Sequence, residues 1–144
     1  MNIDQSARLA SVGNYAFAEC TSLKAMHLTE NITNIGKRAF FKSGLQKVRL
    51  PARLLVLESG TFEDCTNLET AHLNDRITKI QKRCFMGSGL KNITIPQAVE
   101  IIDAGAFMGC RHLEEVRFVK DSKLVEIGDF AFMAAGLRMF KAPS

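Results

Sequence analysis

Apolar residues recur along this chain in one pattern that is repeated six times. Six phenylalanines follow one another at intervals of 23, 22, 23, 22 and 25 residues, and a leucine follows each of them after six or five residues. These residues are Phe17, Phe40, Phe62, Phe85, Phe107 and Phe132, with Leu23, Leu45, Leu68, Leu90, Leu113 and Leu137. A cysteine phrase (CTSL, CTNL, CRHL) alternates with a glycine phrase (SGL, SGL, AGL), so the full unit is a doublet of 45 residues. A fixed period of this length indicates a repeat architecture.

Each leucine begins a stretch in which apolar and polar residues alternate, as in LKAMHL, LQKVRL and LEEVRF. This alternation predicts a short strand with one buried face. A further apolar pair lies eight and five residues before each phenylalanine, and the A-F segment that follows predicts one short helical or 3₁₀ turn. A single unit cannot bury its apolar side, but stacked units share a core. We therefore expect a right-handed α/β solenoid of about six coils. Its parallel sheet would lie on the concave face and its helical turns on the convex side.

Cys20, Cys65 and Cys110 occur at the same repeat position, 45 residues apart. In alternate coils they would be about 10 Å apart, whereas a disulfide needs Cα atoms within about 7 Å. The spacing also differs from the paired ligands that zinc prefers. Ser43, Ser88 and Ala135 occupy this position in the even units. We therefore predict that the cysteines, Cys84 included, are small core residues, and we expect no metal and no cofactor.

The recurrent phrase seen in VGNYAFAECTSL and IGKRAFFKSGL resembles the BspA-like (Treponema pallidum-type) leucine-rich repeat, and the resemblance covers essentially the whole chain. The Asn or Cys of the common leucine-rich repeat is present only as Asn31 and is replaced in later units by Arg53, Arg76, Ala98 and Asp121. The resemblance implies a leucine-rich-repeat solenoid. It also implies a surface-displayed protein for adhesion and recognition, of a kind found in bacteria and parasitic protists.

Residues 1–144 are expected to form one leucine-rich-repeat domain. The opening MNIDQSARL aligns with VRFVKDSKL (116–124), which predicts a strand at residues 1–3, and LRMFKAPS predicts another strand at the other end. Neither end has the polar capping unit that solenoids usually carry. We expect a segment of a longer array, or open ends that associate with a second copy. The first residues lack the pattern of a signal peptide, although the resemblance implies a cell-surface or secreted location.

The outward positions of the predicted strands include a row that is mostly basic. Its members are His27, Arg49, His72, Thr94, Arg117 and Lys141, with Lys47 beside them. Such a row could dock an acidic protein face, an anionic glycan or phosphate groups. It could also be the polar surface that keeps an open sheet soluble. The candidate partner-binding residues are thus His27, Lys47, Arg49, His72, Arg117 and Lys141.

A second candidate interface follows the phenylalanines on the convex side, at Phe41, Met86, Met108 and Met133. These side chains could form an exposed apolar stripe or fill gaps at the edge of the core. The pairs Lys37-Arg38 and Lys82-Arg83 are expected to form a solvated basic edge. Asn31-Ile-Thr33 and Asn92-Ile-Thr94 match the glycosylation pattern.

The pattern as a whole favours a non-catalytic recognition scaffold that mediates protein–protein interaction through the concave sheet. Cell-surface adhesion or host interaction is what the resemblance adds. The alternative is binding of a polyanion, a nucleic acid or an acidic glycan, to the basic row, although this face lacks interleaved aromatic residues. The net charge of +4 agrees with either partner. The chain has no Gly-rich phosphate loop, HExxH or GxSxG motif, so we do not expect an enzyme.

Overall fold

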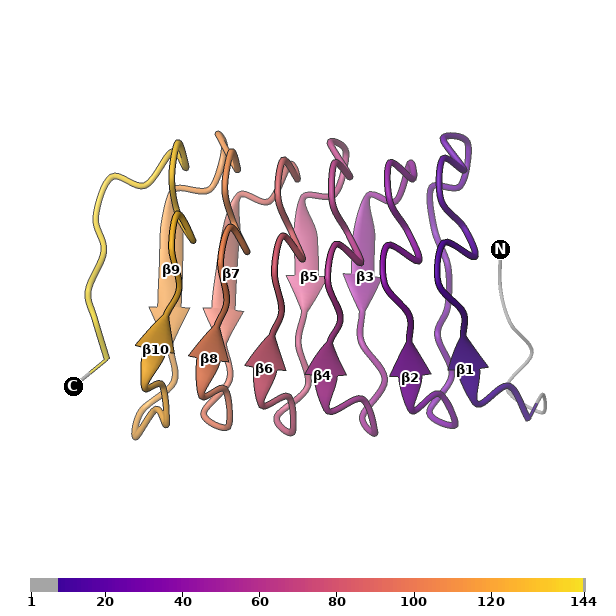
Figure 1. Ribbon diagram of the computed structural model, residues 1–144, viewed down its shortest axis with the longest axis horizontal. Helices are drawn as coiled ribbons and strands as arrows, with labels where there is room; N and C mark the ends of the chain where they lie inside the picture. Colours follow the sequence, from indigo (N-terminus) through magenta and orange to yellow (C-terminus); the bar gives the residue numbers. More distant parts are fainter. Residues whose placement is uncertain (1–7, 144) are drawn as a thin grey trace.

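The computed structural model describes residues 8–143, which form six coils stacked along one axis (Figure 1). Each coil has a short strand on one side. These are β1 (Ser11–Val12), β2 (Asn34–Ile35), β4 (Val56–Leu57), β6 (Lys79–Ile80), β8 (Ile101–Ile102) and β10 (Glu126–Ile127). Four coils have a further strand, namely β3 (Lys47–Arg49), β5 (Thr70–His72), β7 (Asn92–Ile95) and β9 (Glu115–Phe118). All paired strands are parallel, which confirms the predicted solenoid.

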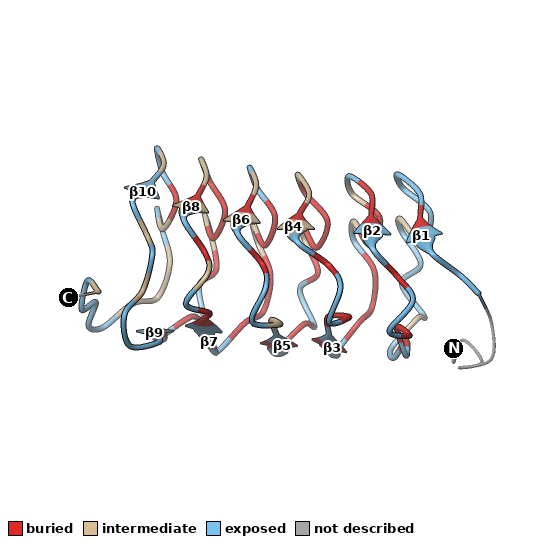
Figure 2. Cartoon of the chain, turned by 90° about the horizontal axis from the view of Figure 1, so that it is seen from below, coloured by how far each residue is buried: buried red, intermediate tan, exposed pale blue. Residues whose placement is uncertain are grey.

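The two sets of strands lie on opposite sides of the coils (Figure 2). We call the side formed by β3, β5, β7 and β9 the concave sheet, in which β3 pairs with β5 and β7 pairs with β9. The other side, formed by the short strands and the turns that follow them, is called the opposite face. Strands β4, β6, β8 and β10 form one continuous sheet there, and β1 pairs with β2. The second residue of each apolar pair before a phenylalanine thus lies in one of these short strands, which the sequence pattern had not predicted.

The repeated phenylalanines form one continuous stack through the core. Neighbouring rings from Phe17 to Phe132 have centroids 5.2 to 5.5 Å apart and lie nearly parallel. Phe40, Phe62, Phe85 and Phe107 are completely buried. Ring stacking and apolar burial therefore stabilise each junction between coils. The alignment of the repeats on phenylalanine is confirmed.

The predicted helical or 3₁₀ turns do not form within residues 8–143. Two residues flank each phenylalanine in the left-handed conformation, for example Arg38 (φ 51°) and Lys42 (φ 55°) around Phe40. Isolated left-handed residues interrupt a right-handed helix. Each coil bends instead through successive tight turns, such as the one closed by the Ala39 N–H donating to Gly36 O at 3.2 Å.

The buried position of the cysteines is confirmed for Cys65, Cys84 and Cys110, which have no exposed surface. The Cys65 thiol donates to Phe40 O at 3.0 Å, and its Sγ lies 3.5 Å from Ser43 Oγ. Both partners belong to the preceding coil. The prediction is wrong for Cys20, which is exposed. Cys20 lies in the first coil of the described part, where no described coil supplies the equivalent cover.

The strands predicted for the two end coils are incomplete. The stretch after Leu23 has only an isolated bridge at His27, and residues 137–143 contain no strand. Near that end Arg138 N reaches Glu114 O at 3.5 Å. Phe140 packs edge-on against Phe118, with ring centroids 5.7 Å apart. The strand predicted at residues 1–3 lies outside the described residues.

Candidate functional site

The concave sheet presents the predicted basic residues to solvent. His27, Lys47, Arg49, His72, Arg117 and Lys141 are all exposed, while the alternate positions Val48, Ala71, Ile93 and Val116 are buried. Strand register places Arg49 beside His72 and Thr94 beside Arg117. The predicted outward direction is therefore confirmed, and a role in binding stays a prediction.

The half of the concave sheet built by β3 and β5 carries uncompensated basic side chains. Lys47 and Arg49 lie on the same face of β3, and His72 is the partner of Arg49 on β5. Within residues 8–143 the side chains of these three residues make no ion pair and no hydrogen bond. Two neighbouring cations on a rigid sheet attract an anionic group placed between them. This half is the positive part of the face.

The half built by β7 and β9 differs because Arg117 is paired. Its Nε donates to Glu115 Oε1 at 2.9 Å, and its Nη2 donates to Oε2 at 3.2 Å. Hydrogen bonding to Arg117 lowers the pKa of Glu115, and the same bond raises the pKa of Arg117. Both groups are exposed, so solvent and salt weaken the attraction. The sequence pattern alone did not reveal this pair, although residues two apart on a strand lie on the same face of the sheet.

Two further ion pairs run along the edge of the concave sheet. Lys91 Nζ lies 3.1 Å from Glu69 Oε2, and Arg138 Nη2 lies 3.9 Å from Glu114 Oε1. All four residues directly follow a repeat leucine, and each pair joins neighbouring coils. Opposite charges at this repeat position were the signal that could have revealed them. Together with Arg117–Glu115, these pairs neutralise part of the charge around β7 and β9, whereas within residues 8–143 Lys47 and Arg49 on β3, and Lys141 near the end of the array, make no ion pair.

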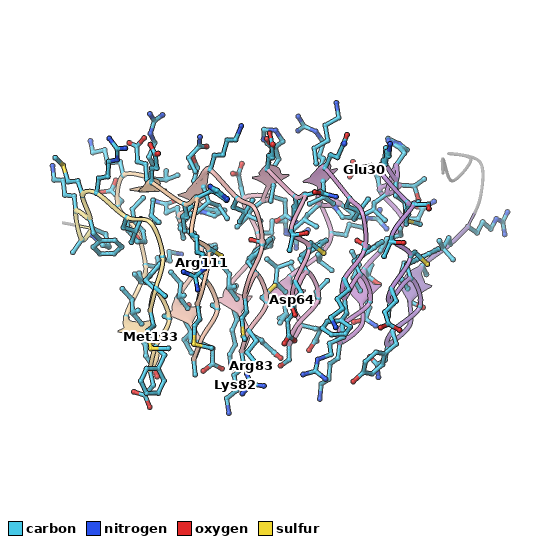
Figure 3. All side chains as sticks on the ribbon, turned by 90° about the horizontal axis from the view of Figure 1, so that it is seen from above. Glu30, Asp64, Lys82, Arg83, Arg111 and Met133 are labelled. Atoms are coloured by element: carbon cyan, nitrogen blue, oxygen red, sulfur yellow. The ribbon has the colours of Figure 1, made fainter. Side chains whose placement is uncertain are left out.

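The second predicted interface is not a uniform apolar stripe. Phe41, Met86 and Met108 are partly buried, and Met133, which is labelled in Figure 3, is half exposed. The Arg38 guanidinium carbon and the Lys42 Nζ lie 5.5 and 5.1 Å from the centroid of the Phe41 ring. Two cations thus cover the aromatic face. Glu63 occupies the same repeat position between Phe41 and Met86.

The buried thiols are held in their neutral form. Burial raises the pKa of Cys65 to about 11 and also raises the pKa values of Cys84 and Cys110. A thiol of this kind is a poor nucleophile, because the thiolate is the reactive species. Among residues 8–143 no group of three or more His, Cys, Asp and Glu side chains gathers to hold a metal. In the same residues no helix is long and apolar enough to cross a membrane.

Solved structures similar to this one are bacterial leucine-rich repeat proteins. A leucine-rich repeat protein from Bacteroides ovatus is 30% identical, with a TM-score of 0.87 over 94% of this chain and 35% of that one. The T. pallidum leucine rich repeat protein is 23% identical, with a TM-score of 0.76 over 92% of this chain and 72% of that one. A leucine rich cell surface protein from Faecalibacterium prausnitzii is 28% identical, with a TM-score of 0.60 over 79% and 39%. The chain spans about a third of the length of the B. ovatus protein.

No curated protein with which the sequence was compared matches it. The family model for the BspA type leucine rich repeat region does match, in six copies over residues 1–114 and 78–144. Those copies agree with the six short strands and the six stacked phenylalanines. Leucine-rich repeats are generally non-catalytic scaffolds that present extended binding surfaces. The repeat type suggests a protein-interaction scaffold, and the chain belongs to the BspA-type leucine-rich-repeat family.

Proposed function

We propose that the chain recognises an acidic surface of a partner protein through the concave sheet. Lys47 and Arg49 are the centre of this site, with His27, His72, Arg117 and Lys141 around them. The observation that carries the proposal is the contrast along the face. The cations on β3 have no carboxylate beside them, whereas Arg117 on β9 is already bound to Glu115.

Pre-organisation supports binding at this place. The side chains stand on paired strands, with Arg49 next to His72, so their spacing is set before a partner arrives. Little backbone entropy is then lost on docking. Carboxylates of the partner would form charge-assisted hydrogen bonds with Arg49 and Lys47.

A cell-surface role, in adhesion or host interaction, is part of this proposal. Its support is the similar F. prausnitzii structure, which is that of a leucine rich cell surface protein. The structure of residues 8–143 itself contributes only the rigid, exposed face.

The alternative partner is a polyanion such as a nucleic acid or an acidic glycan. The same free cations favour it. Against it, the outward positions of β3, β5, β7 and β9 hold no Phe, Tyr or Trp, and His72 is the one aromatic ring among them on which a base could stack. Binding to a polyanion would also fall steeply with added salt.

The test is a capture experiment with proteins extracted from the source organism and from cells it contacts. The Lys47→Glu/Arg49→Glu variant should lose partners that the wild type retains. The matched control is Arg53→Glu/Arg76→Glu, which makes the same charge change on exposed residues of the loops that follow β3 and β5. The control should retain those partners.

Nuclease and glycan-lyase treatment separates the two partner classes. A protein partner survives both treatments, while a polyanion does not. If the Lys47/Arg49 variant and the control capture the same proteins as the wild type, the concave sheet is not the binding site.

A further inference from the structure

Two coils that are 45 residues apart carry the same backbone notch on the opposite face. Gly60 and Gly105 are both left-handed, with φ of 64° and 65°. In each case the arginine of the preceding coil lies across the glycine. A Cβ added to Gly60 would lie 2.7 Å from Arg38 Cγ, and one added to Gly105 would lie 3.5 Å from Arg83 Cγ. The two arginines are therefore held in equivalent positions.

The two notches differ in what the arginine meets. Arg38 Nε donates to Glu63 Oε2 at 3.0 Å, and its Nη1 donates to Tyr15 Oη at 3.3 Å. Glu63 is nearly buried, with 8% of its side chain exposed. The residue equivalent to Glu63 beside Arg83 is Met108, whose Cε would lie 3.7 Å from a Cβ on Gly105. A thioether sulfur is uncharged and only a weak hydrogen-bond acceptor, so Met108 cannot form with Arg83 the ion pair that Glu63 forms with Arg38.

Arg83 consequently has an exposed guanidinium without a protein partner. Within residues 8–143 its side chain makes no ion pair and no hydrogen bond. The position equivalent to Tyr15, in the coil before Arg83, is Gly60, so no phenol reaches it either. We call the space over Gly105, between Arg83 and Met108, the Arg83 notch.

The Arg83 notch opens into a groove of about 470 Å³ on the opposite face. Four cations line this groove, namely Lys37, Arg38, Lys82 and Arg83. Lys82 and Arg83 lie next to each other at the edge of the molecule that faces away from the concave sheet (Figure 3). The acidic lining residues are Glu63, which is paired with Arg38, and Asp129, whose side chain makes no ion pair within residues 8–143. The groove is therefore positive, with Phe130 as an exposed apolar wall.

We infer that this groove binds an acidic peptide segment of a partner protein, with an Asp or Glu carboxylate in the Arg83 notch. The Arg38–Glu63 pair shows the contact that a carboxylate makes with an arginine at this repeat position. Met108 fills the place of Glu63 beside Arg83, so the carboxylate of the partner contacts the guanidinium from its solvent-exposed side. Met108 and Phe130 add apolar contacts for the rest of the segment, and Lys82 adds a second cation. This site lies on the other side of the coils from the face of the proposed function and does not depend on it.

Fluorescence anisotropy with a labelled peptide of alternating Glu and Gly tests the inference, and the same peptide with Gln for Glu is the control ligand. We expect the wild type to bind the Glu peptide and not the Gln peptide. Arg83→Gln should weaken binding about tenfold, the effect of losing one charge-assisted contact. Arg53→Gln, an exposed arginine outside the groove, should leave the affinity unchanged.

Met108→Glu provides a second, independent variant. It gives Arg83 an internal carboxylate, as in the Arg38–Glu63 pair, and should block the peptide to a similar extent. Met86→Glu is its control, because Met86 occupies the same repeat position but does not line the groove. Circular dichroism verifies that each variant is folded. If Met108→Glu does not fold, the peptide affinity of Arg83→Gln alone decides the test.

Three results would overturn the inference. The Gln peptide could bind as tightly as the Glu peptide, Arg83→Gln could leave the affinity unchanged, or Arg53→Gln could weaken binding as much as Arg83→Gln. Lys47→Glu/Arg49→Glu distinguishes the groove from the concave sheet. This variant should retain peptide binding. If it loses peptide binding while Arg83→Gln retains it, the acidic peptide binds to the concave sheet and not to the groove.

Discussion

The first coil and the coils inside the array share one sequence pattern but have different surroundings. Cys65 has no exposed surface, while Cys20, at the same repeat position, is exposed. Phe62 lies between the rings of two neighbouring coils and is fully buried, whereas Phe17 stacks on one ring and is partly buried. The residue types are the same, so the difference comes from the number of neighbours. In this solenoid a repeat position is buried by the adjacent coil rather than by its own unit.

The largest expected effect is on the stacked phenylalanines. Phe62→Ala should lower the free energy of unfolding by about 3–5 kcal/mol, because it leaves a cavity between two rings. Phe17→Ala should cost about 1–2 kcal/mol, since less apolar surface is lost. Guanidinium titration followed by circular dichroism measures both. Equal losses would show that the two coils are equally packed and would break the comparison.

The next effect is a pH dependence from Cys65. Its pKa in the folded state is about 11 against an ordinary value of 9.0, because burial disfavours the thiolate. Below pH 9 both states keep the proton, so the full stability is present. As the pH rises from 9 to 11 the unfolded state loses the proton first, and the contribution of about 2–3 kcal/mol is lost.

Denaturant titrations at pH 8 and pH 10.5 measure this dependence. Cys65→Ala should become less sensitive to pH than the wild type. Cys20→Ala should keep the pH dependence of the wild type, since Cys20 is exposed. A Cys65→Ala variant as sensitive as the wild type would assign the pH dependence to other groups.

The smallest effect concerns two glycines at one repeat position. A Cβ on Gly36 would lie 2.6 Å from Asn14 N in the first coil, so Gly36→Ala should cost about 1–2 kcal/mol. A Cβ on Gly13 has nothing within 4 Å, and Gly13→Ala should stabilise the fold by about 0.4–1 kcal/mol. Thermal denaturation of both variants sharpens the comparison. If Gly13→Ala lowered the stability, the first coil would be in contact with other residues at Gly13.

The stacked interior could be predicted from the sequence because its positions repeat. The spacing of phenylalanine and leucine gave the number of coils. Alternation in the strands gave the outward direction of Arg49 and Arg117. The exchange of cysteine with serine or alanine at one repeat position indicated a small buried side chain, as found for Cys65. These features depend on the repeat alone.

Features that depend on a single neighbour could not be predicted in this way. Arg38 and Lys42 take left-handed conformations that non-glycine residues seldom adopt, so the A-F segment was interpreted as helical. The exposure of Cys20 follows from its place in the array, which the repeat pattern does not encode. The Arg38–Glu63 pair joins residues 25 apart and requires the side-chain directions of two coils.

The contacts between coils join residues about one repeat apart, 22 for Ser43 and Cys65 and 25 for Arg38 and Glu63. Folding rates fall as the mean sequence separation of contacts grows relative to chain length. In this architecture each added coil brings a new interface, while the loop that must close stays the same size. Relative contact order therefore decreases as repeats are added. A longer array of such coils can gain stability while every folding step remains as local as the closure of the first two coils.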